Sequence, residues 1–154
     1  MARVVWQAGE TPHRDATYTR QHVWQFDGGL SVLASASPQR VRTPMSNEAA
    51  VDPEEAFIAA IASCHMLWFL DLARRAGFEL ARYVDDALGT LVEDANGRWA
   101  FQEVQLRPSL SWVGTEPSEA ELAALHHQAH EACFLANSVN FPVRVTAAST
   151  PAAR

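Results

Sequence analysis

The chain has 154 residues, of which 48% are hydrophobic, which is enough to bury the core of one domain. Its formal net charge of −6, without a basic stripe, excludes the electrostatic footprint of a nucleic-acid partner. All 12 cationic side chains are arginine, which excludes Schiff-base lysines and Walker loops. Thiols, imidazoles, carboxylates and guanidinium groups remain for chemistry. We predict a single domain over residues 1–154.

The amino-terminal part is predicted to form a small antiparallel sheet followed by a long loop. Arg3–Gln7 indicates a short edge strand, and Tyr18–Phe26 and Leu30–Ala36 alternate around Asp27-Gly28-Gly29, which is typical of a hairpin turn. Ser37–Val51 has no clear periodicity and is a candidate site-lining loop. Polar residues interrupt the first 15 positions, so a signal peptide is not expected and we predict a cytoplasmic protein.

A long apolar helix is predicted to begin at Pro53. Asp52 caps it, Glu55 closes a capping box, and Gly77 ends it. Its apolar run, Ala56–Leu70, falls short of a membrane span, and we expect a buried core helix rather than a membrane partner. The run is apolar on more faces than one sheet can cover. A second copy of the same helix would cover the rest, so we predict a homodimer.

The second half is predicted to form two paired strands, a helix and a closing strand. Asn96-Gly97 indicates a hairpin, and Ser118 with Glu121 forms a second capping box. The predicted bounds are Phe78–Val92 and Trp99–Val113 for the strands, Glu119 to about Ala136 for the helix, Phe141–Ala147 for the last strand, and 148–154 for a frayed tail. The order βββ-α-ββ-α-β indicates an α+β fold rather than a parallel βαβ alternation.

The chain has only two cysteines, Cys64 and Cys133. Two are too few for a disulfide scaffold, so they are either inert core thiols or a redox pair. Cys64 lies some twelve residues into its helix, too far from the N-terminal dipole for that dipole to stabilise a thiolate, so another cation has to help. Glu54 lies roughly 15 Å away on the same helix. If both serve one site, two chains meet there or an arginine bridges the gap.

The residues around these cysteines resemble the OsmC/Ohr family of thiol-dependent peroxidases, and the resemblance spans nearly the whole chain. Asp52-Pro53-Glu54 and Ser63-Cys64 are similar to the family's Asn-Pro-Glu helix start and its Ala-Cys sequence. His130-Glu131-Ala132-Cys133 is similar to the second-cysteine motif. Phe134 and Ala136 stand where members often have Pro and Ser, so the chain resembles an OsmC-like branch.

The family's site includes an arginine, for which this sequence offers two candidate positions. Arg20, followed by the Asp-Gly hairpin and Pro38, looks like the essential arginine of the Ohr branch. In the OsmC branch the arginine comes from the loop before the long helix, which makes Arg42 or Arg40 the alternative. The resemblance implies that this guanidinium group stabilises the thiolate and that Glu54 orients it.

The resemblance also implies the fold, the reaction and the partners. The fold would be OsmC-like, with antiparallel sheets packed on a long central helix in an intertwined homodimer. Cys64 would attack an organic hydroperoxide, Cys133 would resolve the sulfenic acid as a disulfide, and an external dithiol would restore both, without cofactor or metal. Apolar side chains near these positions favour alkyl or lipid hydroperoxides, and they are Phe57, Ile61, Leu67, Trp68 and Phe141.

Two alternatives from other classes stay open. His126, His130 and Cys133 follow an i, i+4, i+7 spacing on one helix face, with His127 adjacent and Cys64-His65 potentially near, and all are acceptable zinc ligands. The apolar cleft of a dimer could instead hold a lipophilic molecule in a non-catalytic binding protein.

Overall fold

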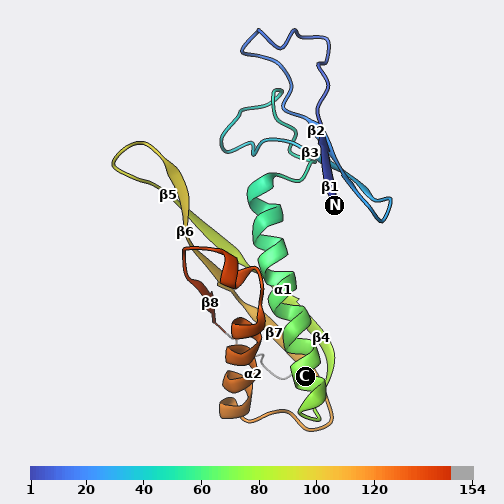
Figure 1. Cartoon of the computed structure of the whole chain (residues 1–154), viewed down its shortest axis with the longest axis vertical. Helices are drawn as coiled ribbons and strands as arrows, with labels where there is room; N and C mark the ends of the chain where they lie inside the picture. The colour runs from blue at the N-terminus through green and yellow to red at the C-terminus, as the bar shows by residue number, and fades with distance from the viewer. Residues whose placement is uncertain (147–154) are drawn as a thin grey trace, which may run out of the picture. The chain divides into compact units, whose positions relative to one another are not determined.

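The computed structural model describes residues 1–146, which form an α+β fold (Figure 1). The α+β class predicted from the sequence is confirmed. The chain divides into two compact units, Met1–Phe57 and the residues from Ile58 onward. A single domain over the whole chain stays a prediction, and the frayed tail predicted at 148–154 lies outside the described residues.

The amino-terminal unit is built on a three-stranded antiparallel sheet in the order β1-β2-β3. The strands are β1 (Ala2–Val5), β2 (His22–Phe26) and β3 (Ser31–Ala34), each shorter than predicted. The hairpin turn between β2 and β3 is where the sequence predicts it, with Gly29 at a φ of 87° that favours glycine. A parallel bridge between Ala34 and Val51 closes the irregular loop 37–51 against β3.

Helix α1 (Pro53–Arg75) has the bounds that the sequence predicts. The capping box is formed, because the Asp52 N–H donates to Glu55 Oε2 at 2.9 Å and the Glu55 N–H donates to Asp52 Oδ1 at 2.8 Å. At the other end Arg74 and Arg75 both pair with Asp71, which places positive charge at the C-terminal dipole. These local interactions explain why the ends could be read from the sequence.

By length and composition alone, α1 could span a membrane. The apolar run Ala56–Leu70, on which the sequence analysis relied, is shorter than the whole helix. Its packing is that of a core helix on one side. Ile61, His65 and Phe69 are at most 1% exposed, at the helical spacing of a single face. The opposite side carries exposed residues, among them Leu67 at 63%.

The long strands predicted in the second half are each broken in two. They are β4 (Glu79–Asp85), β5 (Leu88–Glu93), β6 (Trp99–Leu106) and β7 (Pro108–Val113). The antiparallel pairing is as predicted, β4 with β7 and β5 with β6. At the break the Arg107 N–H donates to Asp85 Oδ1 at 2.7 Å and Arg107 Nε donates to the Asp86 carbonyl at 2.6 Å. These two hydrogen bonds join the two long segments at the point where each strand is interrupted.

The carboxyl-terminal elements are shorter than predicted. Helix α2 (Glu119–Ala132) begins at the predicted Ser118–Glu121 capping box but ends at Ala132, because Cys133 leaves helical geometry at φ −74° and ψ 107°. A 3₁₀ turn η1 (Ala136–Ser138) follows, and strand β8 (Val143–Val145) joins the sheet parallel to β6.

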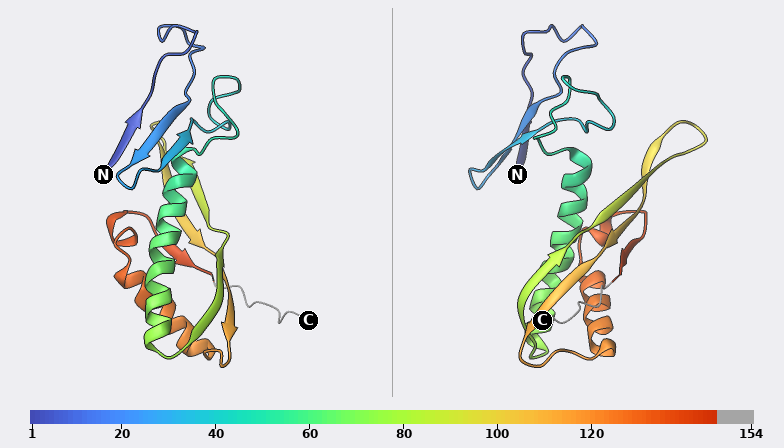
Figure 2. Two further views of the ribbon diagram at one scale, coloured as in Figure 1. Left: turned by 90° about the vertical axis from the view of Figure 1, so that its right-hand side faces the viewer. Right: turned by 180° about the vertical axis from the view of Figure 1, so that it is seen from behind.

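A hydrophobic core in the second unit fixes α1 and α2 beside each other against β7 (Figures 1 and 2). Its buried members are Phe69, Ala73, Leu110, Leu125 and Ala129. The thiols lie on the two helices that this core joins, Cys64 on α1 and Cys133 at the end of α2.

Candidate functional site

The two thiols are neighbours in the second unit, and neither forms a disulfide in this structure. Cys64 is half-buried, whereas Cys133 is fully buried at the C-cap of α2. Burial raises the pKa of the Cys133 thiol, and a hydrogen bond with the Cys64 thiol raises it further. Cys133 Sγ also accepts the Ala136 N–H at 3.4 Å. The site therefore has one partly accessible thiol, Cys64, and beside it a buried thiol, Cys133, whose raised pKa keeps it protonated near pH 7.

The Cys64 thiol faces a largely apolar cavity of about 540 Å³. The walls are Ala60, Ser63, Leu67, Trp68, Asp71, Phe134 and Leu135. Trp68 and Phe134 meet edge to face with ring centroids 5.8 Å apart. Asp71, a charged group in the wall, is neutralised by Arg74 and Arg75. A cavity of this size and lining accepts an apolar small molecule beside the thiol.

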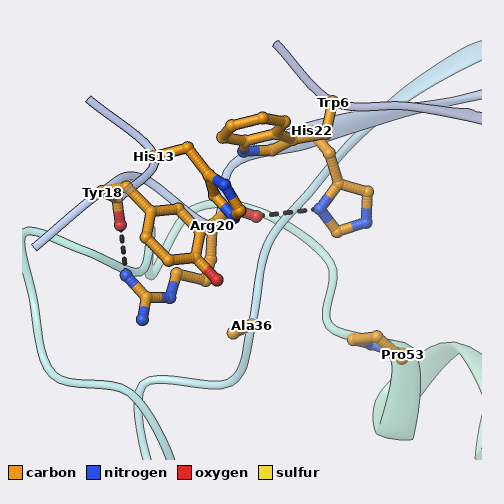
Figure 3. Close-up of a pocket in the computed structure, with 7 residues that line it drawn as sticks. All are labelled: Trp6, His13, Tyr18, Arg20, His22, Ala36 and Pro53. Carbon is orange, nitrogen blue, oxygen red and sulfur yellow. Dashed lines mark hydrogen bonds between the residues drawn. The ribbon is translucent and has the colours of Figure 1, made fainter. Parts of the chain in front are cut away.

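Arg20 lies in the amino-terminal unit in a fixed orientation (Figure 3). Its Nη1 donates to the Ala16 carbonyl at 3.1 Å and to the Tyr18 carbonyl. The guanidinium carbon lies 3.7 Å from the centroid of the Tyr18 ring, a cation–π geometry. Both Nη1 protons are thereby used, which leaves the Nε and Nη2 edge for another acceptor. That edge is a side-on donor fork for a carboxylate.

An aromatic pocket of about 360 Å³ surrounds Arg20 (Figure 3). Trp6, His13 and Tyr18 meet edge to face, with ring centroids 4.7–5.8 Å apart. His22 is held in one tautomer: the Trp24 indole N–H donates to His22 Nε2 at 2.9 Å, so the proton is on Nδ1, which donates to the Arg20 carbonyl. Sequence reasoning missed this pocket because its rings come from separate predicted strands and the loop between them, and their contacts are tertiary.

Glu54 has a buried carboxylate oxygen, Oε2, without a hydrogen-bond partner among residues 1–146. Within the described chain no ion pair joins Glu54 to Arg20. Arg42 and Arg40, the alternative positions, are exposed in the loop before α1. The amino-terminal unit thus contains an unpaired carboxylate oxygen on Glu54 and, on Arg20, a guanidinium edge that is already held in place to donate hydrogen bonds.

A pair of buried histidines joins α1 and α2 in the second unit. His65 Nε2 and His126 Nδ1 are 3.1 Å apart, and the ring planes differ by 11°. Burial lowers the pKa of both imidazoles to about 4, so both are neutral near pH 7. In residues 1–146 no group of three or more His, Cys, Asp or Glu side chains is arranged to hold a metal ion, which leaves the zinc alternative without geometric support.

Comparison with known proteins places the sequence in a family. The family model described as OsmC-like protein matches residues 46–148, which is more than half of the chain. The chain belongs to the OsmC-like family. The OsmC/Ohr resemblance read from its motifs is confirmed. A comparison with curated proteins found no match.

Solved structures of OsmC-like proteins share the fold of this chain. An OsmC-like protein of unknown function from Vibrio cholerae O1 biovar eltor is 44% identical, with 96% of this chain and 97% of that chain covered and a TM-score of 0.92. An organic hydroperoxide resistance protein OsmC from Legionella pneumophila is 20% identical, with 96% and 94% covered and a TM-score of 0.65. The organic hydroperoxide resistance protein OhrB of Bacillus subtilis is 18% identical, with 96% of each chain covered and a TM-score of 0.61. At these lower identities the likeness shows the fold alone.

Proposed function

We propose that this OsmC-like protein is a cytoplasmic, homodimeric thiol peroxidase that reduces organic hydroperoxides. The observation that carries the proposal is the pair of neighbouring free thiols, one open to an apolar cavity and the other buried behind it. Two proteins that share this fold are named organic hydroperoxide resistance proteins, and the proposal assigns a role of that kind to this chain. The protein would act without a nucleic-acid or membrane partner.

The reaction has two steps on the protein. The Cys64 thiolate attacks one peroxide oxygen, the O–O bond breaks, and the alkoxide leaves as an alcohol after taking a proton, so that Cys64 becomes a sulfenic acid. Cys133 then attacks the Cys64 sulfur, the S–O bond breaks, and water leaves as the disulfide forms. An external dithiol reduces this disulfide and is itself oxidised by the same two electrons.

Arg20 and Glu54 would support the first step. The Nε and Nη2 edge of Arg20 is left available by its backbone hydrogen bonds, and Glu54 Oε2 is buried without a partner. Pairing of the two would satisfy both groups and orient the guanidinium group. The remaining positive charge would stabilise the thiolate and the charge that develops on oxygen.

The apolar lining of the cavity beside Cys64 suits alkyl or lipid hydroperoxides. The same lining favours one second candidate, a non-catalytic protein that holds a lipophilic molecule. The candidates differ in whether bound hydroperoxide is reduced.

Substitution of each thiol tests the proposal. Cys64→Ser should abolish the consumption of an organic hydroperoxide such as tert-butyl hydroperoxide. Cys133→Ser should leave one turnover and a sulfenic acid that dimedone traps on Cys64. If wild type and Cys64→Ser consume the peroxide at the same rate, the peroxidase proposal is wrong, and the binding protein becomes the better description.

A further inference from the structure

A hydrogen bond between the His65 and His126 side chains links α1 to α2 across the seam, the buried interface between these two helices. The side chains are 1% and 6% exposed, and the Nε2–Nδ1 separation is 3.1 Å. His126 also stacks on Phe69, one helical turn after His65, with ring centroids 4.3 Å apart and planes at 25°. His126 on α2 thus contacts two successive turns of α1.

The link lies close to both thiols in the sequence and on the helices. His65 directly follows Cys64 on α1. His126 precedes Cys133 by seven residues, which is two turns of α2 and the same face. The distance between the two sulfur atoms depends on how far each helix is rotated and shifted against the other. A hydrogen bond between ring nitrogens restricts both movements, whereas apolar contacts tolerate sliding.

The pair is not the most stable way to fill this seam. His65 Nδ1 and His126 Nε2 are buried without a hydrogen-bond partner among the described residues, and each such group costs desolvation free energy. Apolar side chains of similar shape would extend the surrounding core of Phe69, Leu125 and Ala129 without that cost. Stability alone does not account for two imidazoles at this position.

We propose that His65 and His126 are positioning residues for the thiol pair, and that their hydrogen bond holds α1 and α2 in the register at which Cys64 and Cys133 form a disulfide. The inference rests on the proposed function only in that the two thiols act as a redox pair. Because the positioning concerns the disulfide, it is measured without any peroxide.

The experiment is a redox titration of the full chain in glutathione buffers. Glutathione disulfide oxidises Cys64 and Cys133 to the intramolecular disulfide and is reduced to two molecules of glutathione, so thiols and electrons balance. Alkylation and mass spectrometry give the equilibrium constant. His65→Leu and His126→Phe should each lower this constant at least about fivefold, as expected for the loss of one neutral hydrogen bond. If His65→Leu does not fold, His126→Phe, which keeps a ring against Phe69, carries the test.

Two further variants separate positioning from general loosening. His65→Gln retains an amide near the position of Nε2 and should restore the equilibrium constant to within about twofold of wild type, since one such hydrogen bond accounts for the loss. Leu125→Ala removes apolar volume from the same seam and leaves both imidazoles. It should destabilise the reduced protein to urea but leave the equilibrium constant within about twofold.

The inference is overturned by any of three results. The first is an unchanged constant in His65→Leu and His126→Phe, the second is an equal fall in Leu125→Ala, and the third is the absence of a Cys64–Cys133 disulfide in wild type at any buffer potential. If wild type forms the disulfide but does not consume hydroperoxide, the proposed function fails and the positioning role stands.

Discussion

At the scale of single residues, the contacts of Arg20 are those that best fit a role in the proposed reaction. Two backbone carbonyls and the Tyr18 ring hold its guanidinium group, so its donor edge is oriented before any partner arrives. Preorganisation of this kind is what electrostatic stabilisation of a reacting group needs. Arg42, in contrast, is exposed in the loop before α1.

We expect Arg20→Ala to slow both alkylation of Cys64 and hydroperoxide reduction at neutral pH by at least about tenfold, because one charge-assisted contact is worth roughly 1.5–3 kcal/mol. Arg20→Lys should recover only part of the rate, since lysine keeps the charge but not the planar fork. Arg42→Ala is the matched control and should leave both rates unchanged. A fall in Arg42→Ala alone would assign the role to the loop arginine.

Gly89 on β5 is a residue whose small size the packing requires. A Cβ at this position would lie 2.6 Å from Ile58 Cδ1 and 2.7 Å from Phe101 Cε1, too close for either to stay in place. Gly89→Ala should therefore lower the free energy of unfolding by about 1–3 kcal/mol, measured by urea denaturation. Gly28→Ala, at a position with nothing within 4 Å, should have no comparable cost. Equal stability of the two variants would contradict the packing of β5 on α1.

At the scale of elements, the seam between α1 and α2 makes stability depend on pH. Burial lowers the pKa of His65 and His126 to about 4 from an ordinary value of 6.5, and electrostatic repulsion from His126 and His130 lowers the pKa of His65 further. The unfolded chain therefore binds protons that the folded chain does not. The free energy of unfolding should fall as the pH drops from 6.5 towards 4, by up to about 1.4 kcal/mol per pH unit for each imidazole.

Urea denaturation at pH 7, 6 and 5 measures the slope of the free energy of unfolding against pH. His126→Phe should reduce it, because one titrating imidazole is removed from the buried pair. His127→Gln, which replaces an exposed neighbour on α2, should keep it. A slope that His126→Phe leaves unchanged would show that other groups titrate in this range.

The elements also show which structure could be predicted from the sequence. Both helix starts could be predicted, since Asp52 with Glu55 and Ser118 with Glu121 are interactions within one turn. The breaks in the long strands could not, because the Asp85–Arg107 hydrogen bond depends on pairing across a distant hairpin. The same distinction holds at the site. The motifs indicated both cysteines, whereas the hydrogen bond between His65 and His126 joins residues 61 positions apart.

At the scale of the whole molecule, the outer face of α1 and the residues after α2 leave apolar side chains uncovered. Leu67 is 63% exposed and Phe134 is 69% exposed, and both line the cavity beside Cys64. Large apolar side chains exposed together mark an interaction surface. The sequence predicts that a second copy of the chain covers this surface in a homodimer.

We expect the protein to sediment as a dimer at micromolar concentration and to dissociate only on unfolding. Leu67→Glu should weaken the dimer by placing a charge in an apolar interface, whereas Glu48→Gln at an exposed loop position should not. Sedimentation velocity distinguishes the two states. A stable folded monomer of wild type would contradict the homodimer.

The proposed thiol reaction is tested most directly by oxidising the reduced wild-type protein with one equivalent of tert-butyl hydroperoxide per chain. We predict the loss of both thiols and a single intramolecular disulfide between Cys64 and Cys133, identified by mass spectrometry of unreduced peptides. The accessible thiol reacts first and its buried neighbour completes the disulfide. Retention of both thiols after the peroxide has been added, or a disulfide only between chains, would contradict the account.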